Sequence, residues 1–194
     1  MIGRKLILSI KKALYNSGII IQRRQPWMGN NKWLMNYDIK TVLDVGANVG
    51  KFAVHFAEIF PEATIHSFEP IQSVFSQLEQ NTKGYNVKNY DPIYSPNNSF
   101  LDSHYDLITM TEVLEHLHKP FQEFNSLVSI LRMDGLLGIM TAMHSGIEKF
   151  PSWHYKNDPT HVCFFSRQTM QWLARESDLK ILQQKERTTI FIKN

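Results

Sequence analysis

The chain has 194 residues, of which 43% are hydrophobic and 20% are charged, as expected for one globular domain with a short appendage. Its net charge of +3 argues against nucleic acid as the main partner, and its single cysteine, Cys163, excludes an internal disulfide. No apolar run reaches the ~18 residues of a membrane span, and no segment fits a secretory signal. We therefore expect a cytoplasmic protein.

Residues 1–36 are predicted to form an N-terminal arm with a basic amphipathic helix. The apolar positions at helical spacing are Ile2, Leu6, Ile10, Ala13 and Leu14, and the basic residues between them are Arg4, Lys5, Lys11 and Lys12. Such a helix can dock on its own domain or on a partner, which we favour. The alternative is peripheral contact of residues 1–24 with an anionic membrane.

Residues 41–61 are typical of a strand, a glycine turn and a helix. The apolar, β-branched run 41–45 predicts a buried strand, and the helical pattern after Gly50 stops at Pro61. Glycines let the backbone approach a ligand, and a helix N-terminus presents free N–H groups, so this unit suits a nucleotide-type ligand. Asp44 at the strand's end can meet a cationic or hydroxylated ligand. The alternative is a strand–turn–helix without any ligand.

The wording Asp-x-Gly-x-Asn-x-Gly resembles the S-adenosylmethionine loop of class I methyltransferases, and Val-Gly-Ala-Asn-Val-Gly resembles the FkbM-type branch. This resemblance implies cofactor contacts from Asp44, Gly46, Ala47, Asn48 and Gly50. Asn48 replaces a glycine that is common elsewhere, and asparagine tolerates the positive φ that the turn needs.

The second predicted strand, residues 64–68, ends at Glu69 and Pro70, and Phe68-Glu69-Pro70 again resembles the FkbM pattern. A carboxylate at the end of the second strand can accept from both hydroxyls of a ribose, so we expect Glu69 and Pro70 to line the cofactor site. Residues 87–90 predict a third strand. Asp91 after it either approaches the adenine amino group or is a plain turn residue. Residues 92–104 read as a loop.

A fourth strand is predicted at residues 105–110, and a helix begins at Pro120. The side chains expected to point inward from that helix are Phe121, Phe124, Leu127, Val128 and Leu131. The passage from the fourth strand onward resembles the benzoquinol-methylase-like and type 11/23 group of class I methyltransferases, whose fourth strand ends beside the reacting methyl group. This resemblance adds Thr111 and Glu112 to the expected cofactor contacts and covers residues 37–194, the predicted methyltransferase domain.

A fifth strand is predicted at residues 136–140, and the irregular stretch 142–165 after it is rich in aromatics and histidines. We expect this loop to lie over the methyl group and to form the acceptor pocket, or else to be a packed surface loop. Ser166 should cap a last helix, and residues 179–183 and 189–192 predict a final hairpin. The expected fold is α/β: a Rossmann-like, seven-stranded, mostly parallel sheet with helices on both faces and an antiparallel last strand.

A divalent metal site is a further expectation. Glu112, Glu115 and His116 stand at i, i+3 and i+4, so one helical turn would direct all three the same way, and His161 would join from the later loop. Carboxylates and imidazoles are side chains that commonly bind divalent metal ions. The pattern resembles small-RNA 3′-terminal 2′-O-methyltransferases, whose Glu-x-x-Glu-His and later histidine hold magnesium. The alternative is a solvated Glu112 and a His116 that caps the turn.

The predicted activity is S-adenosylmethionine-dependent O-methylation of a hydroxyl on a small molecule or sugar. The expected catalytic residues are Glu115, His116 and His161. Mg²⁺ or another divalent ion would lower the pKa of the acceptor hydroxyl; without it, His116 or His161 can act as a general base. Two other classes stay open. One is a non-catalytic S-adenosylmethionine-binding module. The other, a nicotinamide-dependent oxidoreductase, is disfavoured because Gly-x-Gly-x-x-Gly is absent.

Overall fold

The computed structural model describes residues 31–91, 100 and 102–194, and its contacts divide the chain into residues 1–37 and 38–194. In the first unit the described element is the 3₁₀ helix η1 (Asn31–Asn36). The predicted amphipathic helix and its membrane contact, residues 1–24, lie outside the described residues. No helix in the described ranges is both long and apolar enough to cross a bilayer.

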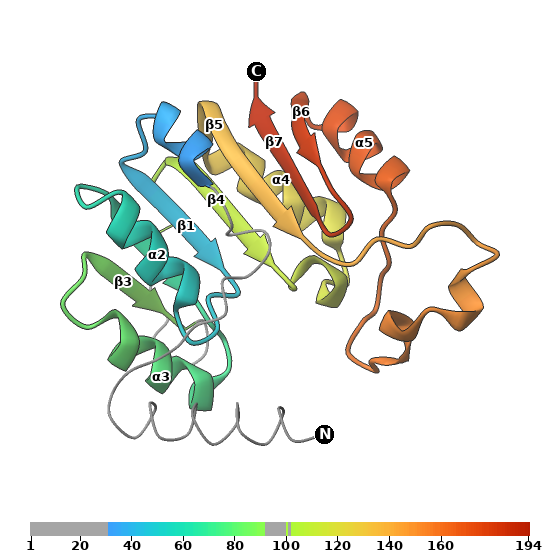
Figure 1. Cartoon of the computed structure of the whole chain (residues 1–194), viewed down its shortest axis with the longest axis horizontal. Helices are drawn as coiled ribbons and strands as arrows, with labels where there is room; N and C mark the ends of the chain where they lie inside the picture. Colours follow the sequence, from blue (N-terminus) through green and yellow to red (C-terminus); the bar gives the residue numbers. More distant parts are fainter. Residues whose placement is uncertain (1–30, 92–99, 101) are drawn as a thin grey trace, which may run out of the picture. The chain divides into compact units, whose positions relative to one another are not determined.

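The second unit is built on one seven-stranded sheet, in the order β3-β2-β1-β4-β5-β7-β6 (Figure 1). The strands are β1 (Thr41–Val45), β2 (Thr64–Phe68), β3 (Val87–Tyr90), β4 (Tyr105–Thr111), β5 (Leu131–Met140), β6 (Leu179–Gln184) and β7 (Thr188–Lys193). The first five pair in parallel, whereas β7 runs antiparallel to both of its neighbours. The predicted Rossmann-like α/β fold is therefore confirmed.

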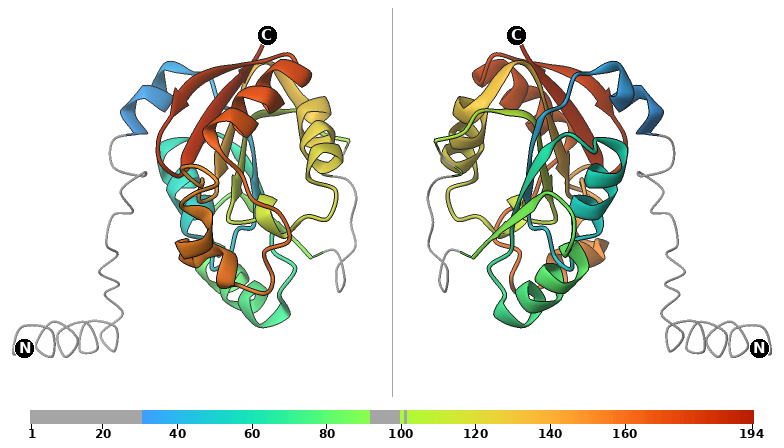
Figure 2. Two further views of the ribbon diagram at one scale, coloured as in Figure 1. Left: turned by 90° about the vertical axis from the view of Figure 1, so that its right-hand side faces the viewer. Right: turned by 90° about the vertical axis from the view of Figure 1, so that its left-hand side faces the viewer.

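Helices lie on both faces of this sheet, and Figure 2 shows α2 and α4 on opposite sides. The helices are α2 (Lys51–Ile59), α3 (Gln72–Thr82), α4 (Pro120–Ile130) and α5 (Arg167–Glu176), with short 3₁₀ turns η3 (Leu114–His116), η4 (Phe150–Ser152) and η5 (His154–Asn157). Helices α4 and α5 share one core with β4 and β5, through side chains such as Phe124 and Leu173. As predicted, Ser166 caps α5, because its side chain accepts from the Thr169 backbone N–H.

The α4 region differs from the prediction in two respects. Phe121 does not point into the core but is 37% exposed, because it pairs with Trp172 of α5 at the molecular surface, with ring centroids 4.9 Å apart. The helix ends at Ile130, and Leu131 begins β5 by pairing with Tyr105. A register shift in that pairing accommodates the exposed residues 132–134, so the strand begins before the apolar run 136–140 that was predicted to form it.

The loop of residues 142–165 lies beyond the carboxyl ends of β4 and β5 (Figure 1). Its base is closed by a bridge between Met143 and Phe165, where the His144 N–H donates to the Phe165 carbonyl at 2.9 Å. The loop thus starts and ends at one point, at the sheet edge where ligands of open α/β folds bind.

Candidate active site

The glycine turn after β1 is pressed against the end of β4. Gly46 has φ +76, and a Cβ there would lie 2.4 Å from Val113 Cγ2 and 3.0 Å from the Thr111 carbonyl oxygen. No side chain fits in that space, which explains why the sequence needs glycine. Asn48 adopts φ 52, as predicted for the position where it replaces a glycine. The turn and the segment after β4 therefore form one contiguous surface.

Asp44 lies behind this turn with no exposed surface. Its Oδ1 accepts from the Thr109 hydroxyl at 2.9 Å, while Oδ2 has no hydrogen-bond partner among the described residues. Burial raises the pKa of Asp44 to about 7 and the nearby Glu69 carboxylate adds to this, whereas the Thr109 hydroxyl and the Ala53 N–H oppose it. The carboxylate is thus costly to ionise until a cation approaches Oδ2.

Glu69, at the end of β2, is 5% exposed and joins the turn to α3. One of its oxygens accepts from the Asn48 backbone N–H and the other from the Ile71 N–H, both at 2.9 Å. Each carboxylate oxygen has a second lone pair, so this arrangement still leaves acceptors for two hydroxyl groups. The predicted ribose contact is compatible with these bonds.

The remaining predicted cofactor residues also lie at the carboxyl edge of the sheet. Asp91 follows β3 and is 1% exposed, which is unlike a plain surface turn residue. Pro70 is exposed after β2, and Thr111 is the half-buried last residue of β4. Ala47 in the glycine turn is buried. Their contact with a cofactor stays a prediction.

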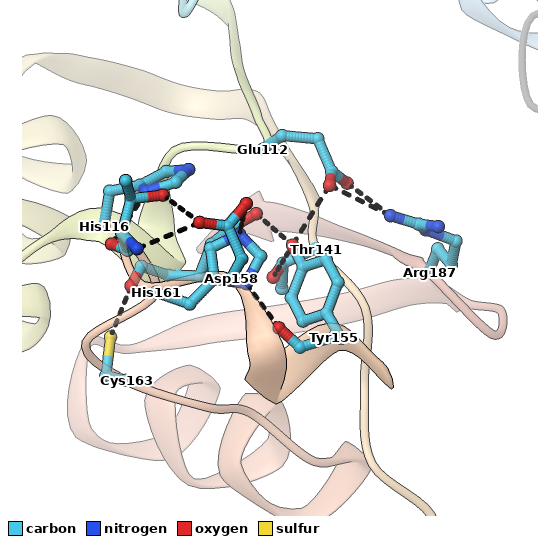
Figure 3. Close-up of polar contacts among 10 residues, drawn as sticks. Glu112, His116, Thr141, Tyr155, Asp158, His161, Cys163 and Arg187 are labelled. Atoms are coloured by element: carbon cyan, nitrogen blue, oxygen red, sulfur yellow. Dashed lines mark hydrogen bonds and ion pairs between the residues drawn. The ribbon is translucent and has the colours of Figure 1, made fainter. Parts of the chain in front are cut away.

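Glu112 does not join Glu115 and His116, so the expectation that one helical turn directs all three the same way is wrong. Glu112 has φ 51 and precedes the helical turn, which begins only at Leu114. Its carboxylate instead accepts from Arg187 Nη2, at 2.8 and 2.9 Å, and from the Tyr155 hydroxyl at 3.0 Å (Figure 3).

The loop of residues 142–165 is bonded directly to η3. The backbone N–H groups of Val162 and Cys163 donate to the Glu115 carbonyl, at 2.9 and 3.2 Å, and the Cys163 thiol donates to the Leu114 carbonyl at 3.2 Å. Burial, with a smaller contribution from Glu115, raises the pKa of the Cys163 thiol to about 11, so it remains a protonated donor. These bonds deliver His161 to η3.

Glu115, His116 and His161 converge: each offers one ligand atom, and the three atoms lie within 4.8 Å of one another. His116 Nδ1 bonds to the Thr160 carbonyl at 3.0 Å, and His161 Nδ1 bonds to the Tyr155 carbonyl at 2.7 Å. A ring nitrogen that faces a carbonyl carries a hydrogen, so in the neutral ring the lone pair is on Nε2. The Asp158 carboxylate lies 3.8 Å from His161 Nε2, beyond hydrogen-bond distance.

Glu115 is fully buried. The Tyr155 hydroxyl donates to its Oε1, whereas its Oε2 has no hydrogen-bond partner among the residues that the structure describes. A buried carboxylate oxygen without a partner, in a residue that lies close to two imidazoles, suits a cation or an acidic proton. Three of the four predicted metal ligands are thus brought together, without Glu112.

Sequence reasoning did not single out Tyr155, Arg187 or Thr141. Tyr155 is one of several aromatics in an irregular loop, where no periodicity marks the residue that points inward. Arg187 lies in the turn of the predicted hairpin, and its carbonyl accepts from the Thr141 N–H at 3.0 Å, which anchors this turn beside the end of β5. Only the folded chain reveals these neighbours.

The sheet order, the reversed β7 and the glycine turn define a Rossmann-like protein, a fold whose ligands commonly bind at the carboxyl edge of the sheet. The sequence model of a family described as "Methyltransferase domain", type 23, matches residues 21–184, and the chain belongs to this family. This confirms the class I S-adenosylmethionine-type methyltransferase and argues against the oxidoreductase. The FkbM-type resemblance of the first half is not confirmed, since one model spans both halves.

Solved methyltransferases share the fold at low sequence identity. An O-methyltransferase family protein from Burkholderia thailandensis superposes with TM-score 0.62 at 11% identity, over 80% of this chain and 50% of that one. A methyltransferase from Archaeoglobus fulgidus gives 0.59 at 14%, over 83% and 89%. The plantazolicin methyltransferase BpumL, solved with a monoazolic desmethylPZN analogue and S-adenosylhomocysteine, gives a TM-score of 0.61 at 13% identity, over 84% of this chain and 79% of that one.

A curated relative matches a shorter stretch of sequence. "Methyltransferase 1" from Beauveria bassiana is 34% identical over 50 residues, which are 26% of this chain and 20% of that protein. The chain therefore spans about a fifth of this relative and half of the Burkholderia structure. Together, the family and the shared fold support S-adenosylmethionine-dependent methyl transfer.

Proposed function

We propose that this chain is an S-adenosylmethionine-dependent O-methyltransferase that acts on a hydroxyl of a small molecule or sugar. The observation that carries the proposal is the convergence of Glu115, His116 and His161 directly after β4, two residues beyond the Val113 side chain that touches the glycine turn. Groups that can take or weaken an acceptor proton thus stand beside the expected cofactor loop.

The cofactor would supply a methyl group on a cationic sulfonium, and Asp44, the glycine turn and Glu69 would hold it. The chain must align the acceptor oxygen with that methyl carbon and must remove the hydroxyl proton. In such a transfer the acceptor oxygen would bond to the methyl carbon as the C–S bond breaks, and a base of this chain would take the hydroxyl proton. His161 suits the base role, because the Tyr155 carbonyl accepts from its Nδ1–H and the neutral ring then has its lone pair on Nε2.

A divalent ion fits the same donors. Histidines that bind metals commonly donate their other ring N–H to a carbonyl, as both histidines do here, and the unpartnered Glu115 Oε2 supplies an anionic ligand. Mg²⁺ or a softer ion on Glu115, His116 and His161 would lower the pKa of an acceptor hydroxyl. Glu112 is not part of this proposed ligand set.

The test is methyl transfer from S-adenosylmethionine labelled with ¹³C at the methyl group, on a panel of hydroxyl, amine and thiol acceptors. The ¹³C shift of the product distinguishes O-methyl from N- and S-methyl groups. We expect O-methyl products and loss of turnover in His161→Ala. N-methyl products would refute the O-methyltransferase assignment. Tight S-adenosylhomocysteine binding without turnover on any acceptor would favour the non-catalytic binding module. Activity that survives exhaustive chelation would refute the proposed role of a metal ion.

A further inference from the structure

Tyr155 contacts both Glu115 and His161, although it was not among the expected site residues. It is 8% exposed and lies in η5. Its hydroxyl donates to Glu115 Oε1, and its backbone carbonyl accepts from His161 Nδ1 at 2.7 Å. The centroids of the Tyr155 and His161 rings are 4.1 Å apart. Figure 3 shows Tyr155 between Glu112 and His161.

We propose that Tyr155 is the positioning residue of this site, which directs Glu115 Oε2 and His161 Nε2 towards a shared point. The inference rests on the proposed function, because it takes Glu115 and His161 as working groups. Tyr155 itself touches neither cofactor nor acceptor in this scheme. It acts through the two side chains that it holds.

The first part of the argument concerns the Glu115 carboxylate. Rotation about its terminal bond changes the directions in which its two equivalent oxygens point, so a donor on one oxygen fixes the direction of the other. Among the described residues, the Tyr155 hydroxyl donates to Glu115 Oε1, and no donor reaches Oε2. The phenol is the donor in this bond, because an ionised carboxylate oxygen can only accept.

Glu112 competes for the same proton, since its Oε2 lies 3.0 Å from the Tyr155 oxygen. A phenol has one proton and can donate fully to one acceptor. Glu112 already accepts twice from Arg187 and its side chain is 35% exposed, whereas Glu115 has no exposed surface. Donation of the phenol proton therefore stabilises Glu115 more than it would stabilise Glu112. Because Arg187 already neutralises Glu112, the proton stays in the hydrogen bond to Glu115.

The second part concerns His161. The Tyr155 carbonyl selects the tautomer with hydrogen on Nδ1, and the packed Tyr155 ring restricts rotation of the imidazole. If Glu115 lost its hydroxyl donor, its carboxylate would accept a hydrogen bond from an N–H of the nearby His161 instead. That would favour the opposite tautomer, with hydrogen on Nε2. Glu115 and His161 would then bond to each other, and neither could bind a ligand at the shared point.

Tyr155→Phe removes the hydroxyl alone and keeps the ring and the carbonyl. Tyr105→Phe is the matched control, because Tyr105 is also a buried phenol whose hydroxyl donates a hydrogen bond, to the Phe100 carbonyl at 2.8 Å, and it lies at the opposite end of β4. The probe is Co²⁺, whose absorption bands report ligand geometry, with calorimetry for affinity. We expect Tyr155→Phe to weaken Co²⁺ binding by about 10–100-fold, the usual effect of losing an outer-shell partner, and to change the absorption bands.

S-adenosylhomocysteine binding should be unchanged in both variants, and Tyr105→Phe should bind Co²⁺ as the wild type does. Wild-type Co²⁺ affinity and absorption bands in Tyr155→Phe would overturn the positioning role and leave the proposed metal intact. If the wild type binds no Co²⁺, the proposed metal fails, and ¹⁵N NMR of the His161 ring decides the positioning role. A shift towards the Nε2–H tautomer in Tyr155→Phe supports it, and an unchanged tautomer overturns it.

Discussion

Replacing Asp44 by asparagine should make the free protein more stable and the cofactor complex weaker. Asp44 has no exposed surface and one unpartnered oxygen, so its ionised form is poorly solvated in the absence of a ligand. Asparagine keeps an acceptor for the Thr109 hydroxyl but carries no charge. The same change removes the anion that is expected to face the cationic cofactor.

The magnitude follows from the pKa of Asp44, which burial raises from 3.8 to about 7. Between these values the folded state binds more protons than the unfolded state, so this group lowers stability as the pH rises from 3.8 to about 7. At about 1.4 kcal/mol per pKa unit, the cost above pH 8 reaches roughly 4 kcal/mol at most. The new amide N–H groups also need partners, so we expect a net gain of about 1–3 kcal/mol.

Urea unfolding of the free protein at pH 5, 6, 7 and 8 measures this effect. The advantage of Asp44→Asn over the wild type should be small at pH 5 and should grow towards pH 8. The control is Asp38→Asn, which removes a carboxylate whose side chain is 82% exposed. A variant that is less stable than the wild type at pH 8, or a gain that does not depend on pH, would refute the reasoning.

Three further outcomes are expected. Calorimetry should show that Glu69→Ala weakens S-adenosylhomocysteine binding by roughly 1.5–3 kcal/mol, and equal affinity would exclude a ribose contact. By urea unfolding, Gly46→Ala should destabilise the fold by about 1–3 kcal/mol more than Gly84→Ala, because both glycines have positive φ but only Gly46 would place its Cβ against neighbours; equal losses would count against that contact. Burial lowers the pKa of His66 to about 4, so between pH 6.5 and 4 its contribution falls as the pH falls. Relative to His66→Phe, the wild type should therefore lose about 1–3 kcal/mol across that window, and parallel pH profiles would contradict this.

The sheet and its glycine turn were predictable because their signals are local. A β-branched run, a turn that needs positive φ and an amphipathic helix each leave a pattern within about ten residues, and Gly46, Asn48 and Ser166 behave as those patterns require. Helix α4 was predicted less well, because Phe121 has a core-like spacing yet meets Trp172 of another helix. Such a partner is invisible to periodicity.

The acceptor side was only partly predictable, since its geometry depends on contacts between distant segments. His161 reaches η3 because the later loop bonds to the Glu115 carbonyl, a connection that no local pattern specifies. The same bonds between the loop and η3 bring Tyr155 to Glu115 and so give it its proposed positioning role. The motif supplied the types of residues, whereas tertiary hydrogen bonds determined which of them meet.

The positive φ of Glu112 has a chemical consequence for the proposed metal site. Had Glu112, Glu115 and His116 shared one helical face with His161 opposite, a four-coordinate ion would have been enclosed by four protein ligands. Structural sites are closed in this way, whereas catalytic sites keep a position open for substrate. The turn at Glu112 sends its carboxylate to Arg187 instead, which leaves Glu115, His116 and His161. If the proposed ion is four-coordinate, three protein ligands would leave one position for an acceptor hydroxyl, so the placement of Glu112 would favour a catalytic site over a structural one. Six-coordinate Mg²⁺ would keep open positions with either ligand set.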